Sequence, residues 1–271
     1  MTDHYAVFGN PIAHSRSPFI HQRFAEDTAQ DLVYTAETAP LDGFADAAAR
    51  FFADGGRGCN VTVPFKLDAA TFADDLTDAA GRAGAVNTLI RTERGLLGDN
   101  TDGIGLVRDL GTHCGVALRA ARVLVLGAGG AVRGVLQPIL AQQPAQVVIA
   151  NRSADKAEKL AAAFADLGPI TACPLDAPAT QDFDVVINGT SSGLSGDVPA
   201  LAPQCVRGAV SYDMVYAHAA TPFQAWSRTN GARAAFDGLG MLVEQAAESF
   251  ERWRGVRPET ARVRAALRAA L

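Results

Sequence analysis

The chain has 271 residues, which allows one large domain or two of ordinary size. Its hydrophobic content of 48% and charged content of 20% are typical of a soluble globular protein with a substantial core. The net charge of −5 and the lack of a basic block argue against a protein that binds nucleic acid.

The chain shows no signal for export or for a membrane. No apolar run reaches the roughly 18 residues that a membrane span needs, and the stretch Met1-Thr-Asp-His4 lacks the pattern of a signal peptide. The cysteines are widely spaced and form no CxxC pair or Cys/His cluster: Cys59, Cys114, Cys173 and Cys205. We therefore expect reduced, mostly buried thiols in a cytoplasmic protein, with no metal site, nucleic-acid partner or membrane partner.

The first hundred residues alternate strand patterns with helix patterns. A helix is expected to begin at Ser17-Pro18, with Ser17 as its N-cap, and another to span Leu41–Ala53. The expected strands are His4–Gly9, Leu32–Thr38, Cys59–Val63 and a hairpin formed by residues 85–91 and 95–99. This alternation predicts an α/β layer.

A second α/β series begins at Arg122. Its expected strands are nearly continuous apolar runs: Val123–Leu126, Val147–Ala150, Val185–Ile187 and Val210–Val215. Strands without polar alternation are typical of a parallel sheet that is covered on both faces. We therefore predict a doubly wound parallel sheet for this part of the chain.

The pattern changes after Gly238-Leu-Gly240. Two helices, Met241–Arg254 and Pro258–Ala270, follow, and no further strand is expected. We interpret these helices as returning to the first domain. The predicted domains are therefore residues 1–104 together with 239–271, and residues 105–238 between them.

A glycine-rich loop follows the first strand of the second series. Gly127, Ala128, Gly129, Gly130 and Ala131 lie between this strand and a predicted helix that runs to Gln142. Glycines allow a tight turn and let backbone N–H groups approach a pyrophosphate at the helix N-terminus. The third glycine of the usual dinucleotide spacing is replaced by Val132, so the strand and helix around the loop carry the prediction of a cofactor site.

The next strand ends in basic residues. Asn151, Arg152 and Ser153 follow it directly, and Lys156 lies one turn later. A site for NAD favours Asp or Glu here, whereas a guanidinium can hold a 2′-phosphate through two hydrogen bonds. We therefore predict NADP, although a solvated arginine at a strand end is the structural alternative.

Other candidate cofactor contacts follow the later strands. Thr190 and Ser191 come after Val185–Ile187, at an edge where open α/β sheets bind ligands, and turn formation is an explanation nearly as good for them. Tyr212-Asp-Met-Val-Tyr216 ends the following strand and is assigned to the nicotinamide end of the site. Gly238 and Met241 could bring backbone to the same ring.

Four polar clusters in the first domain lie at the ends of elements. They are Ser15-Arg-Ser17, Thr62 with Lys66, Asn87-Thr88, and Asp99-Asn-Thr-Asp102-Gly103. Each has a structural explanation; Asp102, for instance, could cap the helix Gly103–Leu110. Together they would line a pocket rich in hydroxyl, amide, ammonium and carboxylate groups, which suits a small polyhydroxylated acid.

Several of these motifs resemble those of the shikimate dehydrogenases. The similar segments run in order along the chain and are Gly9-Asn-Pro-Ile-Ala-His-Ser-Arg-Ser-Pro18, Asn60-Val-Thr-Val-Pro-Phe-Lys66, Gly84-Ala-Val-Asn-Thr88, Gly98-Asp-Asn-Thr-Asp-Gly103, Gly127-Ala-Gly-Gly-Ala131, Asn151-Arg152 and Met241-Leu-Val-Glu-Gln-Ala246. Departures are small: Gly189 stands where many members have alanine, and Ser153 replaces a common threonine.

The resemblance implies an activity, a fold and a set of site residues. The activity is the NADPH-dependent, reversible reduction of 3-dehydroshikimate to shikimate on the route to aromatic amino acids. The fold is an α/β substrate domain plus a Rossmann-type NADP domain, with the site in the cleft between them, in a monomer or homodimer. Lys66 and Asp102 would be the catalytic pair. The implied contacts to substrate are Ser15, Ser17, Thr62, Asn87, Tyr216 and Gln245, and those to cofactor include Asp78, Met214 and Gly238.

The chemistry requires a hydride transfer, a proton transfer and stabilisation of charge on the substrate oxygen. We assign the proton to the Lys66–Asp102 pair jointly, because coupled groups share their titration. Three alternatives remain open: a quinate/shikimate dehydrogenase that uses NAD, a folate-linked methylene dehydrogenase, and a nonenzymatic NADP-responsive binding protein. Arg152 argues against the first, the Ser15/Ser17 pocket against the second, and the joint presence of Lys66 and Asp102 against the third.

Overall fold

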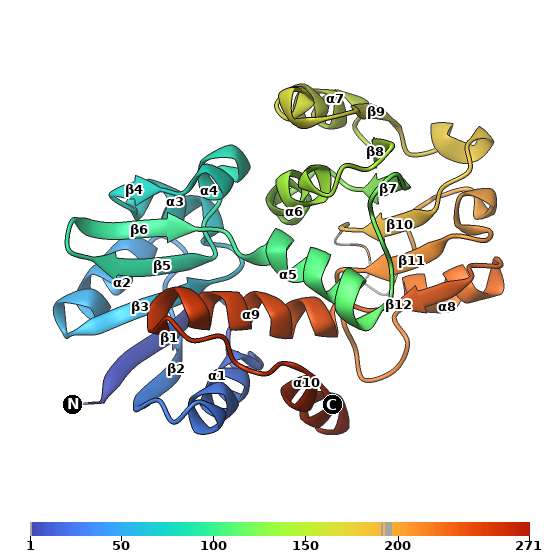
Figure 1. The fold of residues 1–271 in the computed structure, drawn as a ribbon. Coiled ribbons are helices and arrows are strands. Elements are labelled where there is room, and N and C mark those ends of the chain that lie inside the picture. Colours follow the sequence, from blue (N-terminus) through green and yellow to red (C-terminus); the bar gives the residue numbers. More distant parts are fainter. Residues whose placement is uncertain (1, 191, 193–196) are drawn as a thin grey trace. The chain divides into compact units, whose positions relative to one another are not determined.

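The computed structural model describes residues 2–190, 192 and 197–271, and these form two compact units. The first unit runs to Gly105 and resumes at Val243–Ala270, and the second is Leu106–Leu242. The chain leaves and re-enters the first unit within two helices, α5 (Asp102–Arg108) and α9 (Leu239–Arg254) (Figure 1).

The first unit is built on a mixed six-stranded sheet. Its strands are β1 (Asp3–Gly9), β2 (Leu32–Thr38), β3 (Gly56–Val61), β4 (Asp75–Leu76), β5 (Thr88–Thr92) and β6 (Gly95–Asp99), in the spatial order β2-β1-β3-β5-β6-β4. Its other helices are α1 (Ser17–Asp27), α2 (Phe44–Ala53), α3 (Lys66–Phe72), α4 (Asp78–Ala83) and α10 (Ala261–Ala269). The β3–β5 and β5–β6 pairs are antiparallel, and the others are parallel.

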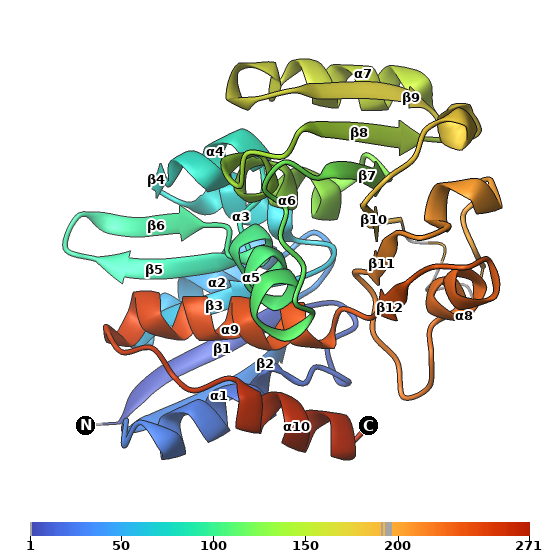
Figure 2. The same ribbon diagram turned by 45° about the vertical axis from the view of Figure 1, so that its right-hand side comes forward.

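Both faces of this first sheet are buried. Along β1, Ala6 and Phe8 pack with side chains of α2, α3 and α4, whereas Tyr5 and Val7 pack on the opposite face with Tyr34. Helices α1 and α10 lie side by side (Figure 2). Successive side chains of β1 point to opposite faces because a strand has a period of two residues, and since both faces are covered the strand is buried from Tyr5 to Gly9.

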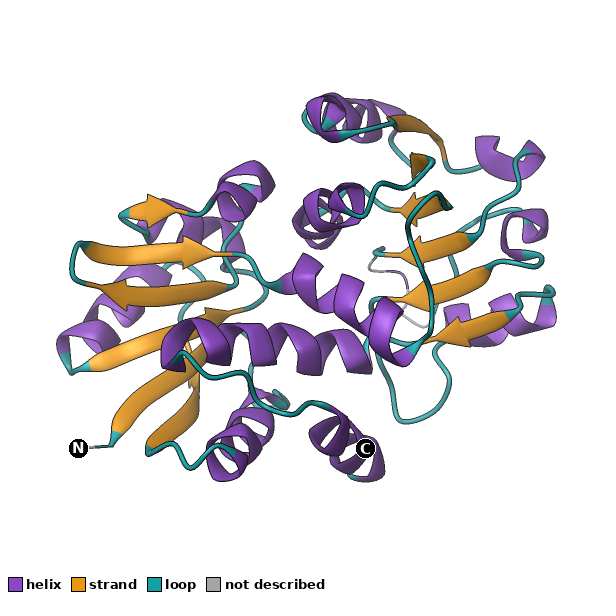
Figure 3. Cartoon of the chain, in the orientation of Figure 1, coloured by secondary structure: helices purple, strands orange, loops and turns teal. Residues whose placement is uncertain are grey.

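The second unit has a fully parallel six-stranded sheet, in which helices join successive strands (Figure 3). Its strands are β7 (Arg122–Leu126), β8 (Gln146–Asn151), β9 (Ile170–Pro174), β10 (Val185–Asn188), β11 (Val210–Asp213) and β12 (Ala234–Phe236), in the order β9-β8-β7-β10-β11-β12. Its α-helices include α6 (Gly130–Ala141), α7 (Ala154–Ala162) and α8 (Pro222–Thr229). This is the Rossmann strand order, whose switch point lies between β7 and β10.

Burial of the second sheet on both faces explains its apolar strands. Val123 and Val125 of β7 pack with side chains of α6 and α7, whereas Leu124 and Leu126 pack with Phe223 of α8. Because neighbouring side chains on a strand point to opposite faces, a strand covered on both sides needs apolar residues at every position. The predicted α/β class and the doubly wound parallel sheet are therefore confirmed.

Several predicted element boundaries were wrong. Helix α1 begins at Ser17, and Arg16 occupies the N-cap position, so Ser17 is not the cap. Helix α2 begins at Phe44 because the preceding residues form a turn closed by Gly43 N–H and the Pro40 carbonyl, 3.0 Å apart. The short strands β4, β9 and β12 were not predicted.

One buried histidine makes the stability of the first unit sensitive to pH. His21 is 1% exposed, and its ring stacks on that of Tyr34 with centroids 4.1 Å apart. Burial lowers the pKa of His21 from 6.5 to about 3. Below about pH 6.5 the imidazole of His21 binds a proton in the unfolded chain but stays neutral in the folded chain. Acid therefore favours unfolding.

We expect this histidine to cost about 1.4 kcal/mol of unfolding free energy for each pH unit below 6.5, down toward pH 3. Replacing it with phenylalanine, His21→Phe, keeps an aromatic ring and removes the proton. Urea denaturation at pH 7, 6 and 5 should therefore show a shallower loss of stability in the variant. Equal pH slopes in the two proteins would contradict the assignment.

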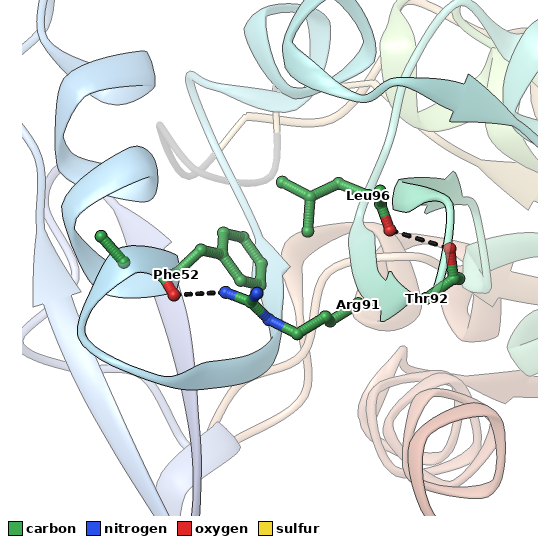
Figure 4. A pocket seen from close by; sticks show the side chains of 6 residues that line it. Phe52, Arg91, Thr92 and Leu96 are labelled. Atoms are coloured by element: carbon green, nitrogen blue, oxygen red, sulfur yellow. Dashed lines mark hydrogen bonds between the residues drawn. The ribbon is translucent and has the colours of Figure 1, made fainter.

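One small surface pocket is lined by none of the predicted site residues. Its volume is about 290 Å³, and its lining includes Phe52, Arg91, Thr92 and Leu96 (Figure 4). The Arg91 guanidinium donates to the backbone oxygens of Phe52 and Gly56. Arg91 thus satisfies a carbonyl at the end of α2, which is a structural role.

The described residues bear on three further predictions, which concern the thiols, a membrane span and a metal site. All four cysteines are free, with Cys59 and Cys205 buried and the other two half-buried. Among the described helices, none is both long and apolar enough to cross a membrane. Over the same residues, no group of three or more His, Cys, Asp or Glu side chains is arranged to hold a metal ion.

Candidate active site

Lys66 is the first residue of α3, and its position follows from the turn after β3. Phe65 N–H binds the Thr62 carbonyl at 3.0 Å, which closes the turn that contains Pro64. The Phe65 ring is fully buried and stacks on Phe44, with centroids 5.4 Å apart. The buried phenylalanine anchors the first turn of the helix, so that the neighbouring lysine is only 23% exposed.

The Lys66 ammonium lies against a carboxylate. Its Nζ is 2.5 Å from Asp102 Oδ2, and the Asp102 side chain is 11% exposed. The other carboxylate oxygen, Oδ1, accepts from Asn87 Nδ2 at 2.9 Å. The Asp102 carboxylate is therefore directed at two side-chain donors, one of them charged.

Asn87 and Gln245 complete this group of side chains. Asn87 is 2% exposed, and its Nδ2 is 3.3 Å from Gln245 Oε1 on α9. Close packing brings α9 to this point, because a Cβ on Gly105 of α5 would lie 2.7 Å from the Gln245 backbone nitrogen. The first unit thus brings together four of the predicted site residues, Lys66, Asn87, Asp102 and Gln245.

The two predicted serines lie at the start of α1. Ser15 Oγ accepts from Ser17 N–H at 3.3 Å, so Ser15 supplies the oxygen that binds the start of this helix. Burial raises the pKa of Tyr34 well above its usual value, and a hydrogen bond with the Ser17 side chain opposes this shift. Thr62 is half-buried, and its methyl group packs over Gly9. A Cβ on Gly9 would lie 2.7 Å from the methyl carbon of Thr62.

The glycine loop of the second unit has the shape that a phosphate cradle requires. Gly127 has φ +104°, a conformation that side chains disfavour, and its N–H binds the Ala150 carbonyl at 2.9 Å. A Cβ on Gly129 or Gly130 would meet nothing within 4 Å, so the loop is open beside the start of α6. The free N–H groups of a helix N-terminus suit a pyrophosphate, so the residues present fit NADP.

Gly189 compensates for the missing third glycine of the motif. Val132 is fully buried in α6, and a Cβ on Gly189 would lie 2.5 Å from its Cγ2 atom. The absent side chain at position 189 therefore makes room for a branched residue at position 132. The two departures from the usual patterns compensate for each other.

The basic residues lie at the same edge of the sheet as the glycine loop. In the β7–β8 register Leu126 pairs with Ala150, so Gly127 and Asn151 both follow the paired ends of adjacent strands. Asn151 Nδ2 donates to the Ser153 carbonyl at 3.0 Å, which shapes the turn. Arg152, Ser153 and Lys156 are exposed there.

The other cofactor candidates follow β10 and β11. Thr190 Oγ1 donates to Asn188 Oδ1 at 2.7 Å, which is the turn role considered above. Met214 N–H binds the Asn188 carbonyl at 2.9 Å, and a Cβ on Gly238 would lie 2.3 Å from the Met214 oxygen. Close backbone approach therefore explains the glycine at 238. Ser191 lies outside the described residues.

The last three candidates are Asp78, Met241 and Tyr216, which were predicted to contact cofactor or substrate. Asp78 lies in the first turn of α4 and is 3.6 Å from Arg82, with its side chain 72% exposed. Met241 is buried in the core of the second unit, and its N–H binds the Tyr212 hydroxyl at 3.3 Å. Tyr216 is half-buried in the loop after β11.

Models of three shikimate dehydrogenase regions match the chain. They describe the shikimate dehydrogenase substrate-binding domain at residues 7–89, shikimate/quinate 5-dehydrogenase at 110–195, and the shikimate 5′-dehydrogenase C-terminal domain at 238–268. A relative from Alkalilimnicola ehrlichii, named shikimate dehydrogenase (NADP(+)), is 57% identical over 99% of both chains. The chain belongs to the shikimate dehydrogenase family.

Solved structures agree with this family assignment. A shikimate 5-dehydrogenase from Thermus thermophilus, in complex with NADP(H) and shikimate, is 32% identical with a TM-score of 0.90 and full coverage of both chains. An Ael1 enzyme from Pseudomonas putida is 44% identical with a TM-score of 0.94, covering 98% of each chain. The resemblance to the shikimate dehydrogenases in the sequence motifs is therefore confirmed.

Proposed function

We propose that Lys66 and Asp102 are the catalytic pair with which this member of the shikimate dehydrogenase family interconverts 3-dehydroshikimate and shikimate. The 2.5 Å contact between Lys66 Nζ and Asp102 Oδ2 supports this assignment most strongly. A carboxylate that holds an ammonium at a defined position keeps its proton within reach of the same substrate oxygen in every turnover. NADPH supplies the hydride of the reduction when it is bound.

The side chains manage the proton and the charge. In reduction, Lys66 donates a proton to the substrate carbonyl oxygen as the hydride reaches the carbon, and it accepts that proton in oxidation. The ammonium also stabilises negative charge that develops on the oxygen. Asp102 orients the ammonium, and Asn87 holds Asp102 through its other oxygen.

The remaining candidates divide between the two ligands. Asn87 and Gln245 lie beside the catalytic pair and offer amide groups to the hydroxyls of a substrate. We assign the other substrate contacts to Ser15, Ser17, Thr62 and Tyr216. The cofactor contacts are assigned to Asp78, residues 127–131, residues 151–153, Lys156, Thr190, Ser191, Met214, Gly238 and Met241, and the open glycine loop supports this choice.

One assay separates this function from its rivals. Absorbance of reduced nicotinamide is followed with shikimate or quinate, each combined with NADP or NAD. We expect the highest kcat/KM for shikimate with NADP. Equal rates with quinate and NAD would support the broader quinate/shikimate activity instead, and no turnover in any combination would exclude both.

The choice of cofactor depends on Arg152. Replacing it with alanine, Arg152→Ala, removes a charged, bidentate partner for a 2′-phosphate, so KM for NADP is expected to rise by about tenfold or more. KM for NAD should stay nearly constant. Arg119→Ala is a matched control, because Arg119 is exposed and precedes β7, at the opposite end of that strand from the glycine loop. An unchanged NADP/NAD ratio would remove the 2′-phosphate assignment.

We further propose that the chain acts in the cytoplasm as a monomer or a homodimer. The four free cysteines support a reducing compartment. Light scattering coupled to gel filtration will give the mass, and a stable assembly larger than a dimer would contradict this prediction.

A further inference from the structure

A buried polar network lies beneath the catalytic pair in the first unit. Its members come from β2, β3, the start of β5, the segment before α5, and α9, and all are 7% exposed or less: Tyr34, Asn60, Thr88, Thr101 and Ser249. Buried polar groups of this kind are costly unless they are hydrogen-bonded, and a satisfied network fixes the orientation of each member. None of the five has a role in the proposed mechanism.

The orientation of the Asn60 amide determines which groups donate and which accept in this network. Its Nδ2 donates to the Asn87 carbonyl at 3.1 Å, and since a carbonyl can only accept, the nitrogen must face this side. The same nitrogen lies 3.1 Å from Thr88 Oγ1, so the threonine oxygen accepts there. The antiparallel register sets this contact, because Asn60 and Thr88 are paired across β3 and β5.

Because Thr88 Oγ1 accepts from Asn60, its own proton points to a different partner. Its hydroxyl donates to Asn87 Oδ1 at 2.8 Å, and Thr101 backbone N–H donates to the same oxygen at 2.9 Å. These two donors, together with the Thr101 hydroxyl at 3.2 Å, hold Oδ1 so that Nδ2 faces Asp102. A flipped amide would place its oxygen 2.9 Å from Asp102 Oδ1, with two acceptors in contact.

Ser249 supports the threonine from α9. Its hydroxyl oxygen is 2.8 Å from Thr88 Oγ1 and 3.0 Å from Asn60 Nδ2. With the Thr88 proton on Asn87 Oδ1, Ser249 is the donor to Thr88, and the Gln245 backbone oxygen one helical turn earlier, 3.0 Å away, is the alternative acceptor of the serine proton. The network thus links α9 to the strand that carries Thr88.

We propose that Thr88 is a positioning residue of the reaction: its hydroxyl, supported by Asn60 and Ser249, holds the Asn87 amide in the orientation that donates to Asp102. Asp102 is thereby kept facing Lys66. The proposal rests on the proposed function of the Lys66–Asp102 pair. Thr88 is fully buried and acts through Asn87, not by contact with substrate.

Two variants of Thr88 separate the hydroxyl from the packing. Thr88→Val keeps the shape and removes the hydroxyl, whereas Thr88→Ser keeps the hydroxyl and removes a buried methyl group. We expect Thr88→Val to lower kcat about tenfold, the value of one hydrogen bond, with dissociation constants for NADP unchanged. Thr88→Ser should retain kcat within about twofold, although loss of a buried methyl group lowers its thermal stability.

The measurements are kcat and KM for shikimate, NADP affinity by fluorescence titration, and the melting temperature of each variant. A kcat that follows the hydroxyl rather than the melting temperature supports positioning. If Thr88→Val keeps wild-type kcat, or Thr88→Ser loses as much as Thr88→Val, the proposal is wrong. Lys66→Ala is assayed alongside: if it is inactive the proposed function stands even where the Thr88 proposal fails, whereas an active Lys66→Ala overturns the proposed function itself.

Discussion

Replacing Lys66 with alanine is expected to lower kcat by about 10²- to 10⁴-fold, the usual contribution of a general acid–base group. The variant removes both the proton donor and the positive charge beside the substrate oxygen. Affinity for shikimate and NADP should change far less, because the other candidate contacts remain. Steady-state kinetics with equilibrium binding distinguishes these effects, and a kcat within about twofold of wild type would contradict the catalytic assignment.

Two controls sharpen this result. Lys159→Ala removes an exposed lysine from α7 and should leave kcat unchanged. Lys66→Arg keeps a cation that can pair with Asp102, but a guanidinium does not release its proton in proteins. We therefore expect Lys66→Arg to bind both ligands and to remain nearly inactive. Substantial activity in Lys66→Arg would show that charge alone carries the role.

The parallel sheet was predictable because its interior strands are short, apolar and covered on both faces. β7, β8, β10 and β11 were found in this way, and the Rossmann order follows once they alternate with helices. The three missed strands lie at sheet edges or are very short: β4 has two residues, β12 has three, and β9 is the edge strand next to β8. A strand of two or three residues carries no readable period, so only its pairing defines it.

The candidate site was predictable to the extent that its residues belong to local motifs. Lys66 and Asp102 are separated by 36 residues, and the sequence motifs suggested that they meet; the structure places their charged atoms in contact. Thr88 and Ser249 could not be connected in advance, because their contact depends on how α9 packs beside β5. The only signal was that both positions hold small hydroxyl residues near predicted site residues, which is a common pattern elsewhere.

Asp102→Asn is expected to lower kcat by about 10²-fold or more, because a neutral amide no longer holds the ammonium where the proton is delivered. If Lys66 and Asp102 act as a unit, the two losses will not add. In the Lys66→Ala background, Asp102→Asn should then change kcat by less than about threefold.

The double-mutant cycle therefore tests the pair itself rather than either residue. Asp155→Asn, an exposed carboxylate on α7, is the control for removing one negative charge, and it should leave kcat unchanged in both backgrounds. Losses that multiply in the double variant would mean that Asp102 contributes independently of Lys66, for instance by binding substrate directly. A coupled result places the function of Asp102 in holding the lysine, as the contact of its Oδ2 with Lys66 Nζ indicates.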